Sequence, residues 1–95
     1  MKYTVRQKAA AQKDLKKWLR IWDAESTQDV WDILCEPCNI CDLSEKCSVC
    51  PIQTACHAHH FRITAWADRT SHRSRAETRI HIAAIIIVLL RITLT

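Results

Sequence analysis

Six cysteines lie within 22 residues of a 95-residue chain that has no cysteine elsewhere and no glycine. Thiolates bind metal ions, and thiols can also pair as disulfides or act as nucleophiles. A chain this short often needs a metal or cross-links, because its apolar core alone is marginal. The cluster is therefore the feature of the sequence most able to do chemistry; its members are Cys35, Cys38, Cys41, Cys47, Cys50 and Cys56.

Four of these cysteines form two C-x-x-C pairs separated by five residues, and each pair can bend the chain so that both sulfurs face one ion. Four thiolates around one ion make the tetrahedral, closed site of structural zinc. The intervening loop is tighter than in common two-pair zinc ribbons, which keeps other ligands in consideration. We predict a Zn²⁺ site at Cys38, Cys41, Cys47 and Cys50, with Cys56, Cys35 and His57 as reserve ligands.

An iron-sulfur cluster is the alternative cofactor. The run Cys35-x-x-Cys38-x-x-Cys41, with Pro51 after a later cysteine, resembles the C-x-x-C-x-x-C-x-x-x-C-P run of bacterial ferredoxins. The match is imperfect, because five residues and Cys47 intervene and there is one such run instead of two. Disulfides are a third reading, but six cysteines allow 15 pairings, so that reading predicts nothing specific.

The compartment bears on this choice. Residues 1–12 contain bases but no apolar core of the length that export signals need, so we expect the protein in a reducing cytoplasm. Disulfides are rare in a reducing cytoplasm, which favours metal ligation.

A nucleophilic role is the weaker interpretation of the same region. His57, His59 and His60 follow Cys56 closely and could form a Cys-His pair. No third group that would orient such a pair is identifiable, and a surface loop with one histidine near the metal accounts for the pattern. We expect no enzymatic activity.

Positive charge is concentrated after the cysteines. The formal net charge is +4, and all six bases beyond residue 56 are arginines, which bind carboxylates and phosphates in bidentate fashion. Either a solvated face or a binding face explains their spacing. As contacts to an acidic partner, a nucleic acid or a protein, we nominate Arg69, Arg73, Arg75 and Arg79.

The elements that must position these residues are predicted to be helical. Apolar residues at helical intervals predict a helix over 4–22, with Val5, Ala9, Leu15, Trp18, Leu19 and Trp22 on its apolar face. Capping residues at 26–29 predict a short second helix that leads into the first cysteine. Ser74 followed by Glu77 is a capping-box pattern that begins a C-terminal helix over 75–93. The β-branched run 85–88 favours a strand instead, but length and cap favour helix.

We therefore predict a mainly α fold, a small helical domain organised around a cysteine-rich zinc-binding loop region. It is a single domain over 1–95: N-terminal helices in 1–34, the metal-binding region in 35–56, a connecting segment in 57–74 and the helix 75–93. Little regular structure is expected in 35–56, which is rich in turn formers. Phe61, Ile63 and Trp66 are expected to pack on the first helix.

The aliphatic run over 80–90 is the only membrane candidate. It is far shorter than the roughly 20 apolar residues that span a bilayer, so we interpret it as a buried element and expect no membrane association. If the run is exposed, a homo-oligomer formed through this helix is expected.

A family resemblance adds to this interpretation. The stretch from Cys38 to Ile52, followed by Cys56, resembles small uncharacterised cysteine-rich proteins of bacteriophages and prophages. They share C-x-x-C, a short polar loop, C-x-x-C-P with an aliphatic residue, and one more cysteine. This chain departs from them by lacking glycines before the last cysteine and by adding Cys35. The resemblance implies a metal-binding phage accessory protein made in a bacterial host.

Together these observations predict a zinc-stabilised phage accessory or interaction protein that binds a host protein or nucleic acid. The alternative is an iron-sulfur protein of electron transfer. No small-molecule substrate is indicated.

Overall fold

All regular structure in the described residues, 3–44, 50–69 and 74–95 of a computed structural model, is helical. The mainly α prediction is confirmed for this part of the chain, and the C-terminal aliphatic run is helix and not strand. In chain order the elements are α1 (Val5–Asp23), α2 (Thr27–Leu34), α3 (Asn39–Ser44), α4 (Gln53–Ala55), the π-helical turn η2 (Cys56–His60), α5 (Phe61–Ala67) and α6 (Arg75–Leu94).

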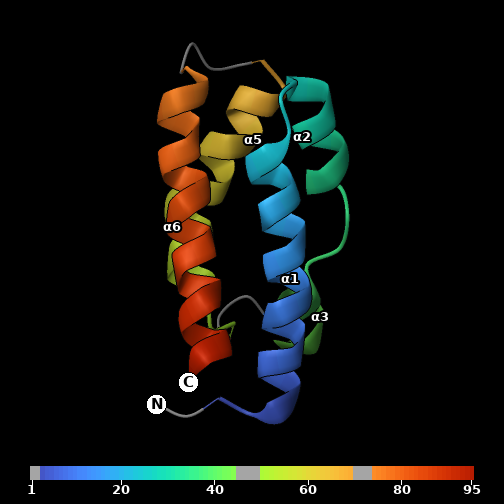
Figure 1. Ribbon diagram of the computed structural model, residues 1–95, viewed down its shortest axis with the longest axis vertical. Coiled ribbons are helices and arrows are strands. Elements are labelled where there is room, and N and C mark those ends of the chain that lie inside the picture. The colour runs from blue at the N-terminus through green and yellow to red at the C-terminus, as the bar shows by residue number, and fades with distance from the viewer. Residues whose placement is uncertain (1–2, 45–49, 70–73) are drawn as a thin grey trace.

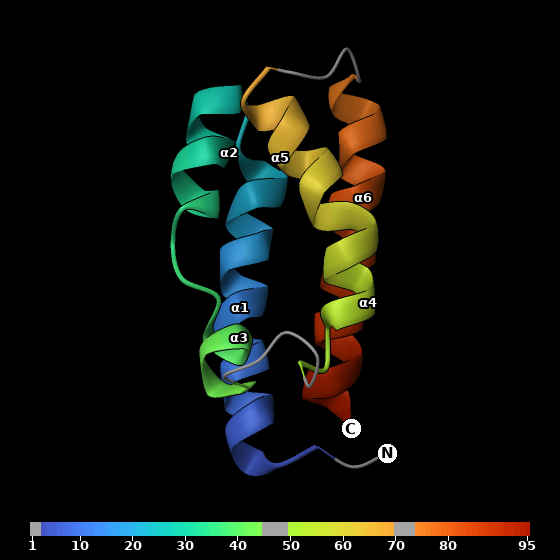
Figure 2. The ribbon, with the colours of Figure 1, turned by 180° about the vertical axis from the view of Figure 1, so that it is seen from behind.

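The two long helices, α1 and α6, run antiparallel along the length of the molecule (Figure 1). The shorter elements lie behind them, with α2 and α5 toward one end and α3 and α4 toward the other (Figure 2). At one end of the long pair, Lys8 Nζ donates a 2.7 Å hydrogen bond to the carbonyl of Thr95. At the other end, the guanidinium of Arg79 donates to the carbonyl of Trp22 at 3.0 Å.

Local capping residues start three of the helices. Thr4 and Gln7 form a reciprocal capping box at the start of α1. The hydroxyls of Ser26 and Ser74 each accept a hydrogen bond from the backbone N–H three residues later, at the starts of α2 and α6. Such side chains satisfy the amide groups that the first helical turn leaves without partners. The predicted positions of these helices are confirmed.

The buried face of α1 differs from the predicted one. Val5 is 84% exposed and Leu19 46% exposed, so these two residues do not face the core. The buried positions are instead Ala11, Asp14, Lys17, Trp18 and Ile21. A polar pair replaces apolar residues on this face because Asp14 and Lys17 hold the following segment onto the helix.

A single core unites the long helices with the cysteine region. The aliphatic side chains of Ile21, Ile63 and Ile85 are almost fully buried in it, and so are Ile40 of α3 and Ile52 just before α4. Side chains of the metal-binding region thus pack in the same cluster as those of α1 and α6.

The cysteine-rich region is more regular than predicted. The sequence indicates turns, yet 39–44 and 53–60 are helical. The connecting segment contains α5, which lies against α2, α6 and η2. Within it Ile63 is buried, whereas Phe61 is 59% exposed and lies beneath the guanidinium of Arg62. The expected packing of Phe61 on the first helix is therefore wrong.

Candidate metal centre

One buried carboxylate positions the first C-x-x-C pair. Asp14 of α1 is 0% exposed, and it accepts hydrogen bonds from the backbone N–H groups of Asn39 and Ile40, both at 2.8 Å. It also accepts from the Asn39 side chain at 3.0 Å. These are amide groups of the first turn of α3, so a residue 25 positions earlier in the chain caps this helix. The helix that carries Cys41 is thereby fixed against α1.

A second set of contacts holds the residues just before α3. Lys17 of α1 is 8% exposed, and its ammonium donates to the carbonyl of Glu36 at 2.7 Å. The side chain of Glu36 forms an ion pair with Arg20 at 2.8 Å. Three side chains of α1 therefore fasten the entry to the cysteine region, and this fixes the backbone on either side of Cys38.

Two cysteines from separate segments meet at the centre of the region. The sulfurs of Cys41, on α3, and Cys50, just before α4, lie 3.9 Å apart. Two sulfurs bound to one tetrahedral zinc at about 2.3 Å are about 3.8 Å from one another. Cys50 is buried with 6% exposure, and Cys41 is partly buried. The geometry of this pair fits one edge of a zinc-thiolate tetrahedron.

Two more thiols affect the pKa of Cys41: one lowers it through a side-chain hydrogen bond, and the other raises it by its charge. These are Cys38, one turn earlier, and Cys56, the first residue of η2. Burial raises the pKa of the Cys41 thiol to about 11. Burial also raises the pKa of Cys38, and the neighbouring carboxylate of Asp14 raises it further. Without a metal these two thiols keep their protons at neutral pH, so a bound cation has to displace them.

Cys38 contacts both a carboxylate and a neighbouring thiol, since its side chain is hydrogen-bonded to Cys41 as well as to Asp14. Its thiol donates a hydrogen bond to Asp14 Oδ2 at 3.3 Å. A thiolate in this place would face a buried carboxylate across the same distance, which is repulsive. Among the predicted ligands Cys38 is thus the one whose role as a ligand requires a local rearrangement.

The predicted ligand set is described only in part. Cys47 lies in residues 45–49, outside the described residues. Within the described ranges, no three or more His, Cys, Asp or Glu side chains form a group that could hold a metal ion. Of the reserve ligands, Cys35 is exposed at the C-cap of α2 and His57 is exposed on η2. Cys35, Cys38, Cys41 and Cys50 are free thiols.

Three histidines occupy defined places that the sequence did not indicate. The Nδ1 atoms of His59, on η2, and His81, on α6, are 2.8 Å apart, so one ring donates to the other. His60 packs edge-on against Trp18, with ring centroids 5.8 Å apart. Burial lowers the pKa of His60, and the ammonium of Lys17 lowers it further. These contacts join η2 to both long helices.

The nominated arginines make internal contacts. The guanidinium groups of Arg75 and Arg79 donate to the carbonyls of Ala24 and Trp22 at the end of α1. Arg79 also stacks over the Trp22 ring, 4.6 Å from its centroid. These contacts cap the C-terminal end of α1, where cations are favoured. Arg69 follows α5 with a positive φ of 66°, and its Nε donates to Thr27 at 3.3 Å. Arg73 lies outside the described residues, and binding of an acidic partner stays a prediction.

No protein-family model, curated protein or solved structure matches this chain. Among the described helices, none has both the length and the apolar character that a bilayer-spanning segment needs.

Proposed function

We propose that this chain is a small zinc-stabilised interaction protein, without a catalytic role of its own. The single observation that supports this best is the 3.9 Å separation of the Cys41 and Cys50 sulfurs. That separation suits two thiolates on one tetrahedral zinc and is too long for a disulfide.

The chain offers a complete donor set around this pair. Cys47, three residues before Cys50, supplies a third thiolate by its C-x-x-C spacing. The fourth is Cys38, as the sequence predicts, or Cys56, which already acts electrostatically on Cys41. A zinc ion bound in this way has no open coordination position, so its role is to hold α3 to the start of α4 and not to activate a substrate.

The interaction role is supported by the surface that this centre holds in place. Large apolar side chains are exposed on α1, α5 and α6, including those of Leu19, Phe61 and Ile80. The net charge of +4 favours acidic partners. In agreement with the resemblance to phage proteins, we propose an accessory protein of the bacterial cytoplasm that binds a host protein or nucleic acid.

Metal content tests the proposal directly. Protein purified without chelator is expected to carry one zinc ion per chain by native mass spectrometry, with no visible absorbance. The Cys50→Ser variant is expected to lose the zinc, since it removes one end of the close sulfur pair. Cys35→Ser is the matched control and is expected to retain it, because Cys35 is exposed on α2.

The fourth ligand is identified by a second pair of variants. If Cys56 is the fourth ligand, Cys56→Ser weakens zinc binding and Cys38→Ser leaves it intact. If Cys38 is the fourth ligand, Cys38→Ser weakens zinc binding and Cys56→Ser leaves it intact. A wild-type chain that binds no zinc contradicts the proposal. Brown protein containing iron and acid-labile sulfide would replace it with the iron-sulfur alternative.

A further inference from the structure

Helix α6 is apolar on two opposite faces. Its inner face is buried in the core through Ile82, Ile85, Leu89 and Ile92. A helix that is apolar all round is normally covered on all sides. The outer face is nonetheless open, and the exposed fractions of its large side chains are 68% for Ile80, 49% for Ile87, 38% for Leu90 and 81% for Leu94.

The outer residues follow the spacing of a helix-pairing seam. Positions 80, 87 and 94 are seven residues apart, and 76, 83 and 90 form a second series of the same period. Alternating steps of three and four residues in this way place all six side chains in one row, as in coiled coils. From Ile80 to Leu94 the row extends about 21 Å along the helix. It consists of Ala76, Ile80, Ala83, Ile87, Leu90 and Leu94, and we call it the outer row.

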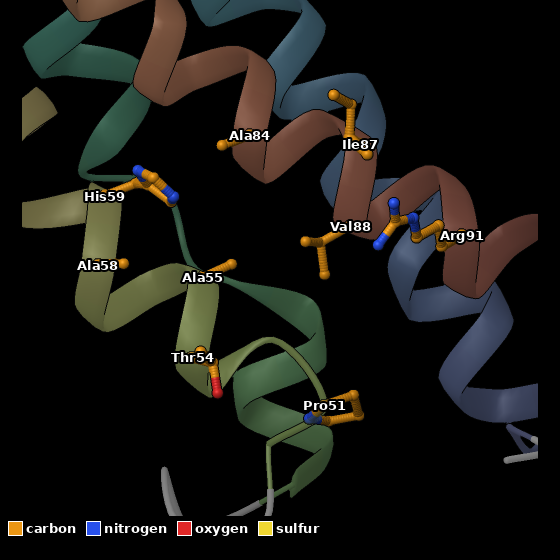
Figure 3. Close-up of a pocket in the computed structure, with 9 residues that line it drawn as sticks. All are labelled: Pro51, Thr54, Ala55, Ala58, His59, Ala84, Ile87, Val88 and Arg91. Atoms are coloured by element: carbon orange, nitrogen blue, oxygen red, sulfur yellow. The ribbon is translucent and has the colours of Figure 1, made fainter.

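Hollows flank the outer row on both sides. Toward α1, a hollow of about 200 Å³ is lined by Leu19, Trp22, Ala83, Ile86 and Ile87. Toward α4 and η2, a groove of about 410 Å³ reaches from Pro51 to His59, and Ile87 and Arg91 lie at its α6 edge (Figure 3). Ile87 borders both hollows, so it stands on the ridge between them. Leu19, 46% exposed on α1, widens the apolar surface.

We propose that the outer row pairs with the outer row of a second copy of this chain, the two α6 helices running antiparallel. In this register Ala83 of each copy lies opposite Ile87 of the other, Ile80 opposite Leu90, and Ala76 opposite Leu94. In two of these three pairings an alanine faces a large side chain, which lets the two rows interdigitate, and Ile80 and Leu90 form a large apolar pair between them. A parallel pair would place Ala83 against Ala83 and Ile87 against Ile87, and would fit less well.

Charge supports the same orientation. Glu77 and Arg91 are fourteen residues apart, which is two heptads, so they lie on the same flank of the outer row. Arg91 borders the groove toward α4 and η2. In the antiparallel register Glu77 of one copy comes opposite position 93 of the other, two residues or about 3 Å along the helix from Arg91, which the long arginine side chain spans. The two-fold symmetry produces this pair twice. A chain with a net charge of +4 gains from such pairs when it associates with itself.

Sedimentation equilibrium tests the pairing. The wild-type chain is expected to be a concentration-dependent dimer. Ile87→Glu and Ile80→Glu are expected to weaken dimerisation at least tenfold, because they place a carboxylate in the apolar seam. Ile80 is more exposed than Ile87, so a glutamate at position 80 disturbs the fold less. If Ile87→Glu unfolds the chain, Ile80→Glu still tests the pairing. Val5→Glu is the control, since Val5 is 84% exposed and lies outside the outer row. Far-UV circular dichroism verifies that the variants remain helical.

A charge exchange tests the orientation. Glu77→Arg and Arg91→Glu are each expected to weaken the dimer, and the double variant is expected to restore it. Failure of the double variant to recover affinity contradicts the antiparallel register.

A wild-type chain that stays monomeric overturns the inference as a whole. The highest concentration to be tested is about 1 mM, which is on the order of the dissociation constant of the weakest specific associations. Binding of that monomer to anionic lipid vesicles would then assign the outer row to a membrane surface. None of these measurements depends on zinc.

Discussion

His60 is a histidine whose surroundings oppose its charged form. It lies edge-on to Trp18, its Nδ1 is 3.3 Å from the Thr64 hydroxyl, and the ammonium of Lys17 is close by. Burial is the main cause of its lowered pKa, and Lys17 is the second. Its titration is thus set by burial and by the charge of Lys17 on α1.

This surrounding makes stability depend on pH. In the unfolded chain the pKa of His60 is near 6.5, and in the folded chain it is lower. The unfolded state therefore binds the proton first as the pH falls below about 6.5, so the free energy of unfolding decreases over that interval. Above about pH 6.5 His60 is neutral in both the folded and the unfolded state, so it does not change the free energy of unfolding with pH. Urea unfolding of chelator-treated protein between pH 7.5 and 5 is expected to show this loss.

The control for this prediction replaces a histidine on the same turn. His60→Gln is expected to flatten the acid side of the profile, while His57→Gln, at an exposed position of η2, leaves the loss unchanged. If both variants show the same profile as the wild type, the effect does not come from His60.

Helix α3 is capped at its N-terminus by a side chain of another helix. It has six residues and no local capping side chain in the manner of Ser26 or Ser74; Asp14 of α1 takes that place. Short helices have little stability of their own, so this long-range contact decides whether the segment is helical.

Removal of the cap is expected to be costly. Asp14→Ala leaves the buried backbone N–H of Ile40 without an acceptor, and it removes hydrogen bonds to a charged group. The free energy of unfolding is expected to fall by about 3 kcal/mol, measured by urea denaturation. Asp23→Ala, an exposed aspartate of the same helix, serves as the control and is expected to change it by less than about 0.5 kcal/mol. Equal effects of the two variants would argue against the capping role.

The contrast between α3 and the capped helices explains how far the sequence predicts the fold. Ser26, Ser74 and the Thr4 box are signals within three residues of the amides they bind, so α1, α2 and α6 were predictable. The signal for α3 lies 25 residues away in Asp14. In the sequence, Asp14 and Lys17 share one face of α1 with the apolar residues Ala11, Trp18 and Ile21. The apolar face predicted from Val5 and Leu19 lies elsewhere on the helix, so it does not reveal this role of Asp14.

For the whole molecule, the cysteine region and the helical core form one unit. Ile40 and Cys50 belong to the same buried cluster as residues of α1, α5 and α6. The C-x-x-C spacing predicts one site for both pairs. One cysteine of each pair, Cys41 and Cys50, lies within 3.9 Å of the other, and the four-cysteine set stays a prediction. The turn of Cys38 toward Asp14 was not predictable, because it depends on how α3 docks against α1.

Because the packing is shared, zinc bound at the proposed centre would stabilise the entire chain. At a free zinc concentration 100 times the dissociation constant, binding to the folded state contributes about 2.7 kcal/mol. For a domain of this size that raises the melting temperature by roughly 10–20 °C. Differential scanning calorimetry with and without zinc measures the shift. Cys41→Ser is expected to abolish it, and a zinc-independent melting temperature in the wild type would count against the proposed centre.

The Asp14 cap also sets an order of events during synthesis. The N-terminal part of a chain leaves the ribosome first, at about 5–20 residues per second. Helix α1, with its own capping box, is therefore available before Asn39 and Ile40 emerge, and its aspartate can receive them at once. Cys41 is then held in place before Cys47 and Cys50 emerge. The second cysteine pair thus emerges beside a first pair that is already anchored to α1, which shortens the time in which all the thiols are exposed to solvent together.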